Sequence, residues 1–136
     1  MIIPLNYDLA AVVNRITLGT VVIAHSLYLK LFIFTLPGTA EFFSSIGLPG
    51  LLAYVVFVLE AVCGIALISG FQSQLASIIL IPVLLGATWA HWGSGWLFSN
   101  QGGGWEYPLV LVLMAVVQAF LGNGKYAITQ ESADAK

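Results

Sequence analysis

An all-α integral membrane protein, a four-helix bundle, is the fold class that the sequence predicts, and three observations favour it. The 136 residues are 60% hydrophobic and only 7% charged, whereas an ordinary soluble domain is about 25% charged. The apolar residues gather into four runs of a length suited to crossing a bilayer as helices. These runs lack the alternating pattern of a barrel strand, so their backbone groups are expected to bond within helices.

The four spans together leave no room for a soluble domain. They are expected over about residues 9–34, 51–71, 75–92 and 107–121. The fourth covers only about 22 Å, less than a hydrocarbon core of about 30 Å. Trp105 and Tyr107 are expected to seat it at the membrane interface. The whole chain, 1–136, is therefore predicted to form one transmembrane domain that ends in a polar tail at 125–136.

The connections contain helix breakers where this layout needs them. Pro37 and Gly38 are predicted to close the first span. Thr39 is predicted to cap a short interfacial helix over residues 40–46, between the first and second spans. The glycine-rich stretch 93–104 is expected to be a loop.

The few charges exclude one class of partner and indicate an orientation. Four Lys and Arg against six Asp and Glu provide no basic run to bind phosphates, which excludes nucleic-acid binding. Four spans put both termini on one side. Arg15, Lys125 and Lys136 outnumber Lys30, so both termini are predicted to be cytoplasmic.

Two charged residues fall inside predicted spans. A charge at the centre of a membrane helix costs about 2.5–3.5 kcal/mol on insertion scales, so it needs a partner. Arg15 and Glu60 are expected to differ in depth by only about 5 Å, and we expect them to pair. Such a pair either fixes the register of the helices or relays protons, and the sequence leaves both interpretations open.

A second polar cluster is expected near the outer surface, built by three spans and the short helix. Its candidate catalytic residues are His25, His91 and Glu106. Its candidate substrate-binding residues are Lys30, Glu41, Trp92 and Trp105. Imidazoles beside carboxylates can exchange protons with a redox ligand such as a quinone.

Simpler interpretations exist for each member of that cluster. Lys30 can snorkel to the interface, Glu106 can favour a helix start, and the tryptophans can form an interfacial belt. No metal is predicted, because the two histidines lie on different helices without a Glu-x-x-His motif. The single cysteine, Cys63, excludes an internal disulfide and lies in an apolar stretch where a thiol is inert.

Several short motifs stand in order along the chain. They are Arg15, His25 to Lys30-Leu31, residues 42–49 (FFSSIGLP), Glu60 with Gly64, Gly70, residues 103–108 (GGWEYP) and residues 122–124 (GNG). In this order and spacing they resemble the DoxX family of small four-helix membrane proteins over nearly the full length. The resemblance implies a multi-pass protein of a bacterial or archaeal cytoplasmic (inner) membrane.

The resemblance also implies two functions. Related DoxD and DoxA proteins are subunits of a thiosulfate:quinone oxidoreductase, and other DoxX-like proteins resemble membrane anchors for redox-defence enzymes. We therefore expect a membrane subunit of a quinone-linked oxidoreductase with an outer-leaflet cavity, in which Lys30 attracts an anionic donor. The alternative is a non-catalytic scaffold or anchor. Expected partners are the lipid bilayer and other membrane or redox subunits, or further copies of the chain.

Overall fold

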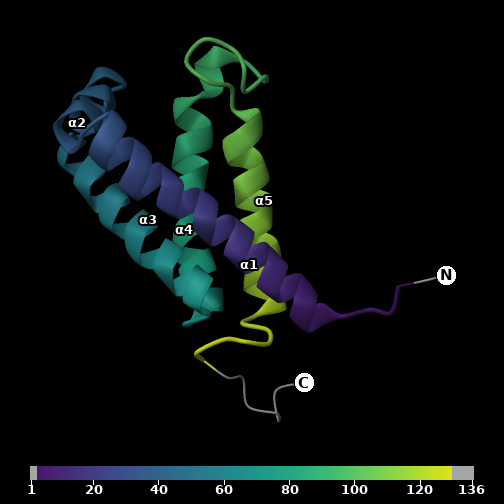
Figure 1. The fold of residues 1–136 in the computed structure, drawn as a ribbon. Helices are drawn as coiled ribbons and strands as arrows, with labels where there is room; N and C mark the ends of the chain where they lie inside the picture. Colours follow the sequence, from purple (N-terminus) through teal and green to yellow (C-terminus); the bar gives the residue numbers. More distant parts are fainter. Residues whose placement is uncertain (1–2, 130–136) are drawn as a thin grey trace.

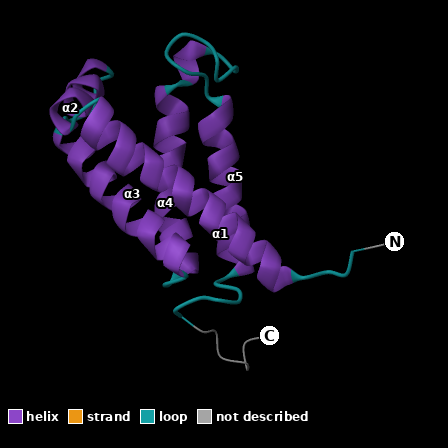
Figure 2. Ribbon diagram, in the orientation of Figure 1, coloured by secondary structure: helices purple, strands orange, loops and turns teal. Residues whose placement is uncertain are grey.

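The structure, a computed structural model, describes residues 3–129. It is all-α, and no strand occurs in that range (Figure 2). The helices are α1 (Tyr7–Ile23), the π-helix η1 (Ala24–Ile33), α2 (Leu36–Ser45), α3 (Leu51–Ser69), α4 (Ser73–Ala90), the 3-10 turn η2 (Trp92–Ser94) and α5 (Glu106–Leu121). Residues 130–136 of the predicted tail, with Lys136, lie outside the described residues.

Three of these helices are long and apolar enough to cross a membrane. They are Tyr7–Ile33, which joins α1 and η1 into 27 residues, α3 with 19 residues and α4 with 18 residues. The apolar helix α5 is shorter, with 16 residues, so a fourth crossing stays a prediction. The protein is a multi-pass membrane protein.

The long helices pack in a ring. α1 contacts α3 and α5, and α4 contacts the same two helices. In Figure 1, α1 crosses the other helices obliquely, and its start lies at the same end as the segment that follows α5. We call this end, with the α3–α4 turn at 70–72, the terminal end. The opposite end, with α2 and the loop at 95–105, is the loop end.

The first connection differs from the prediction. Thr35, not Thr39, caps the short helix, because its hydroxyl oxygen accepts a hydrogen bond from the backbone N–H of Gly38 at 3.2 Å. α2 therefore begins before Pro37, which lies in its first turn, where proline needs no hydrogen-bonding partner for its nitrogen. The hydroxyl of Thr39 is buried and donates to the carbonyl of Thr35 at 2.8 Å.

Two glycines set the crossing of α1 over α3. A Cβ atom on Gly19 would lie 2.9 Å from the backbone oxygen of Gly64, and a Cβ on Gly64 would lie 2.7 Å from the side chain of Ile23. Small residues at such a crossing let two membrane helices approach closely. The close approach brings Leu18 and Leu67 into the buried core.

The crossing predicts a large difference between two glycine substitutions. Gly19→Ala is expected to lower the free energy of unfolding by about 1–3 kcal/mol, because the added methyl group meets backbone in a packed interface. Gly86→Ala is the control: a Cβ there has no neighbour within 4 Å, and alanine favours a helix by up to about 1 kcal/mol. Denaturant titration in mild detergent, followed by circular dichroism, measures both. Equal effects would contradict the close crossing.

Candidate functional site

A pocket of about 570 Å³ lies at the loop end of the molecule. Its walls come from η1, the end of α4, the loop and the first turn of α5. The lining residues are His25, His91, Phe98, Gly103, Gly104, Tyr107 and Pro108. The structure thus brings His25 and His91, which are 66 positions apart in the sequence, to a single pocket.

Each imidazole is oriented by a backbone carbonyl. The Nδ1 atom of His25 lies 2.9 Å from the oxygen of Val21, and the Nδ1 atom of His91 lies 3.0 Å from the oxygen of Gly102. A carbonyl oxygen only accepts hydrogen bonds, so Nδ1 is the nitrogen that carries the proton in each contact. The Nε2 atom of each neutral ring then remains able to accept a proton.

Tyr107, which was expected only to seat the fourth span at the interface, also lines the pocket. Its ring stacks on the ring of His25, with centroids 5.8 Å apart and an interplanar angle of 28°. The side chain keeps 41% of its surface exposed, and the phenol adds a hydrogen-bond donor to the wall. The signal that could have found it is its place beside Glu106 at the start of α5.

Glu106 holds the loop. It is the first residue of α5, where a carboxylate complements the helix dipole. Its Oε2 atom accepts a hydrogen bond from the backbone N–H of Phe98 at 3.2 Å. The backbone N–H groups of Trp105 and Glu106 also donate to the oxygens of Gly95 and Trp96, at 3.0 and 3.1 Å. Because Phe98 lines the pocket, Glu106 shapes the pocket through the loop.

The loop tryptophans pack mainly on one another. The rings of Trp92 and Trp105 stack with centroids 4.6 Å apart, and Trp96 meets Trp105 edge-on at 4.5 Å. Neither Trp92 nor Trp105 is among the residues that line the pocket. Glu41 is exposed on α2, which packs on η1 and α3. The structure therefore does not place Trp92, Trp105 or Glu41 among the residues that line the pocket.

The expected Arg15–Glu60 pair is wrong, because Glu60 forms an ion pair with Lys30. Glu60 is 6% exposed and lies near the middle of α3, so the ammonium group of Lys30 is drawn into the bundle instead of reaching the outer surface. Since Glu60 neutralises Lys30, the structure does not support the predicted attraction of an anionic donor by Lys30. The pair joins η1 to α3 in place of the predicted link from α1.

Arg15 is satisfied by the backbone. Arg15 as a residue is 1% exposed, and its guanidinium group donates to the oxygens of Leu67 and Ile68, at 3.0 and 2.7 Å. These are carbonyls at the end of α3, where the helix dipole is negative. The remaining bonds reach the segment after α5, at the oxygens of Asn123 (3.1 Å), Lys125 (3.3 Å) and Tyr126 (3.0 Å).

Those five bonds use all five N–H donors of a guanidinium group. An arginine is not deprotonated in proteins, so this geometry favours a structural role for Arg15 over the alternative of a proton relay. The contacted carbonyls lie seven and eight residues beyond Glu60, which places them about 10–12 Å further along α3.

The fold and these contacts define a multi-pass helical membrane protein with an imidazole-lined pocket at one end and a buried guanidinium at the other. The family model DoxX matches residues 10–92, more than half of the chain. The chain belongs to the DoxX family. The matched range includes Arg15, Lys30 and Glu60, and it ends before the loop that completes the pocket.

The chain is also similar to one relative that carries a name. Over 82 residues the chain is 27% identical to a Bacillus subtilis (strain 168) protein named "Putative oxidoreductase CatD". The match covers 60% of this chain and 59% of that protein. No solved structure matches this chain.

Proposed function

We propose that this protein is a membrane subunit of a quinone-linked oxidoreductase and that the loop-end pocket receives the quinone ring. The observation that carries the proposal is the meeting of two imidazoles and a phenol, from His25, His91 and Tyr107, in one pocket. The oxidoreductase name of the Bacillus subtilis relative supports the reaction class. The proposed setting is a bacterial or archaeal cytoplasmic membrane, with both termini cytoplasmic and the pocket on the outer side.

The residues of the pocket fit such a ring. A volume of about 570 Å³ is within the usual range for small-molecule sites, about 300–1,000 Å³. Phe98 and Pro108 supply apolar walls, and the stacked rings of His25 and Tyr107 supply a flat surface. A quinone carries two ring oxygens, which need hydrogen-bonding partners, and the imidazoles and the phenol can provide them.

The chemistry assigned to this chain is proton handling. A bound quinone supplies the redox chemistry, in which it takes up two electrons and two protons on reduction. His25 and His91, each with Nδ1 held by a carbonyl, present Nε2 as the atom that holds or releases a proton. The electrons come from a reduced sulfur compound, such as thiosulfate, by way of a partner redox subunit. Tyr107 orients the ring of His25, and Glu106 keeps the loop closed on the pocket.

Binding of a short-chain quinone analogue to the purified protein in lipid nanodiscs tests the proposal. His91→Ala is expected to weaken binding about tenfold, the effect of losing one hydrogen bond of about 1.4 kcal/mol. The matched control is Glu41→Gln, an exposed substitution on α2, which is expected to leave the dissociation constant unchanged. Calorimetric titration gives both values. If the unmodified protein binds no analogue, or if His91→Ala binds as well as the unmodified protein, the pocket is not a quinone site.

A second candidate function is a non-catalytic anchor for redox-defence proteins. The observation that favours it is that several predicted site residues serve internal contacts: Lys30 pairs with Glu60, Glu106 holds the loop and Trp92 stacks on Trp105. Under this alternative, Glu106→Ala alters thermal stability and capture of a partner protein. The unmodified protein then binds no quinone analogue, even at the highest concentration at which it stays folded.

A further inference from the structure

A second hollow lies at the terminal end, on the side of α3 that faces away from the core. Its volume is about 490 Å³. Its lining is almost wholly apolar and consists of Val62, Ile65, Ala66, Ser69, Phe71 and Ile128. Val62, Ile65 and Ser69 share one face of the helix, because they are spaced by three and four residues. The groove therefore follows the last two turns of α3 for about 10 Å.

The segment after α5 builds one wall of this groove. The backbone N–H of Ile128 donates to the oxygen of Ser69 at 3.2 Å, and that of Thr129 donates to the oxygen of Gly70 at 3.1 Å. The hydroxyl oxygen of Thr129 accepts from the N–H of Gln72 at 3.1 Å. These bonds fix Ile128 beside the end of α3, although its own side chain is 70% exposed.

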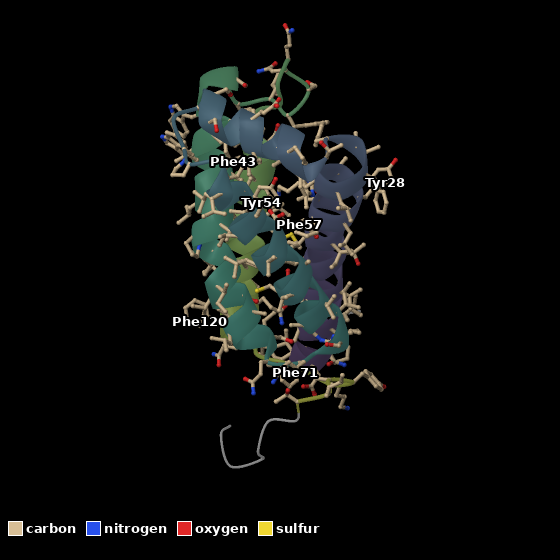
Figure 3. All side chains as sticks on the ribbon, turned by 90° about the vertical axis from the view of Figure 1, so that its left-hand side faces the viewer. Tyr28, Phe43, Tyr54, Phe57, Phe71 and Phe120 are labelled. Atoms are coloured by element: carbon tan, nitrogen blue, oxygen red, sulfur yellow. The ribbon has the colours of Figure 1, made fainter. Side chains whose placement is uncertain are left out.

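Phe71, in the turn between α3 and α4, also lines the groove. Figure 3 faces the side of the molecule on which α3 lies and shows Phe71 at the terminal end, near the segment after α5. Phe71 is 54% exposed. Two large apolar side chains, those of Phe71 and Ile128, thus project where a membrane-spanning helix ends, which is the level of the headgroups.

We infer that this groove binds the acyl chain of one phospholipid from the leaflet at the terminal end. The groove belongs to the outward face of a spanning helix, where Val62 and Ile65 are 60% and 58% exposed, so hydrocarbon is the medium that meets it in a bilayer. Its apolar lining suits an acyl chain. The site is separate from the loop-end pocket and does not depend on the quinone proposal.

Lys125 gives the site a headgroup preference. Its side chain is exposed, whereas its backbone oxygen is held by Arg15. It precedes Ile128 by three residues in a segment fixed at the headgroup level. One lysine near a membrane surface is worth about fivefold in affinity for anionic lipid. The lipid held in the groove is therefore an anionic phospholipid in preference to a zwitterionic one.

Native mass spectrometry of the purified full chain tests this site, with phosphatidylglycerol or phosphatidylcholine of equal chain length added to the detergent. The unmodified protein is expected to retain one phosphatidylglycerol. Ala66→Phe fills the groove and is expected to lower the bound fraction at least fivefold. The matched control is Leu113→Phe, on α5, exposed and outside the groove, which is expected to bind as the unmodified protein does.

Two further variants keep the test independent of folding. Ile128→Ala removes one wall from an exposed position and leaves the backbone bonds, so it is expected to lower retention while the melting temperature is unchanged. Lys125→Gln is expected to abolish the preference for phosphatidylglycerol and leave binding of phosphatidylcholine. The inference is overturned if Ala66→Phe and Leu113→Phe bind lipid alike. It is also overturned if the groove variants dissociate a dimer and leave the lipid count unchanged, because the occupant of the groove is then a second copy of the chain.

Discussion

Arg15→Gln is expected to prevent stable assembly of the bundle or to lower its free energy of unfolding by about 3–5 kcal/mol, the range for removing one partner of a buried charged interaction. The guanidinium group joins the end of α3 to the segment after α5 through five carbonyl oxygens. A glutamine has two donors and cannot replace five. Denaturant titration in detergent measures the loss, and limited proteolysis should cut the segment after α5 first.

Arg15→Lys separates charge from geometry. A lysine keeps the positive charge near the negative end of α3 but donates from a single nitrogen. It is expected to restore part of the stability and to leave the segment after α5 sensitive to protease. If Arg15→Lys were as stable and as protected from protease as the unmodified protein, positive charge alone would stabilise this end of the bundle. The five hydrogen bonds would then be unnecessary.

Loss of either member of the Lys30–Glu60 pair is expected to have the second large effect. Lys30→Met leaves the Glu60 carboxylate uncompensated in a side chain that is only 8% exposed. Removal of one partner of a buried ion pair costs about 3–5 kcal/mol, whereas replacement of both partners by apolar residues is often close to neutral. The double variant Lys30→Met with Glu60→Met is therefore expected to be more stable than Lys30→Met alone.

A double-mutant cycle measures this coupling directly. The control cycle joins Arg15→Gln to Glu60→Met, for which the structure predicts additivity, since Arg15 bonds to carbonyls well beyond Glu60. A coupling of more than about 1 kcal/mol for Lys30 with Glu60, and less than about 0.5 kcal/mol for Arg15 with Glu60, is the expected pattern. The reverse pattern would restore the pairing predicted from the sequence.

The long helices could be predicted because apolar runs in this chain have few interruptions. The turn at Gly70 and the start of α5 near Glu106 fall within a few residues of the expected positions. The start of α2 was missed because both Thr35 and Thr39 can cap a helix, and the choice depends on whether Pro37 begins the helix or ends the one before it. The π-helical form of η1 has no sequence signal comparable to a hydrophobic period.

The site was harder to predict, because polar side chains in a membrane choose among many partners. Arg15 was predicted to pair with Glu60 because a buried charge needs a partner. In the structure, backbone carbonyls at the end of α3 supply that partner instead. No pattern in the sequence marks a segment that supplies such carbonyls from 108 or more residues away. His25 and His91 were predicted to lie together because each was expected near the outer end of its helix, and both line the loop-end pocket. Tyr107 was missed because aromatic residues at membrane interfaces are common.

The side-chain oxygen of Asn123 accepts a hydrogen bond from the backbone N–H of Ser73 at 2.8 Å, at the start of α4. The segment after α5 therefore holds α4 through Ser73 and α1 through Arg15. Both helices are synthesised before this segment, so these contacts form only after the rest of the bundle has left the ribosome. A reporter enzyme fused directly after Leu121 would therefore report the topology of a protein that lacks these contacts. A fusion placed after Thr129 would keep every one of them.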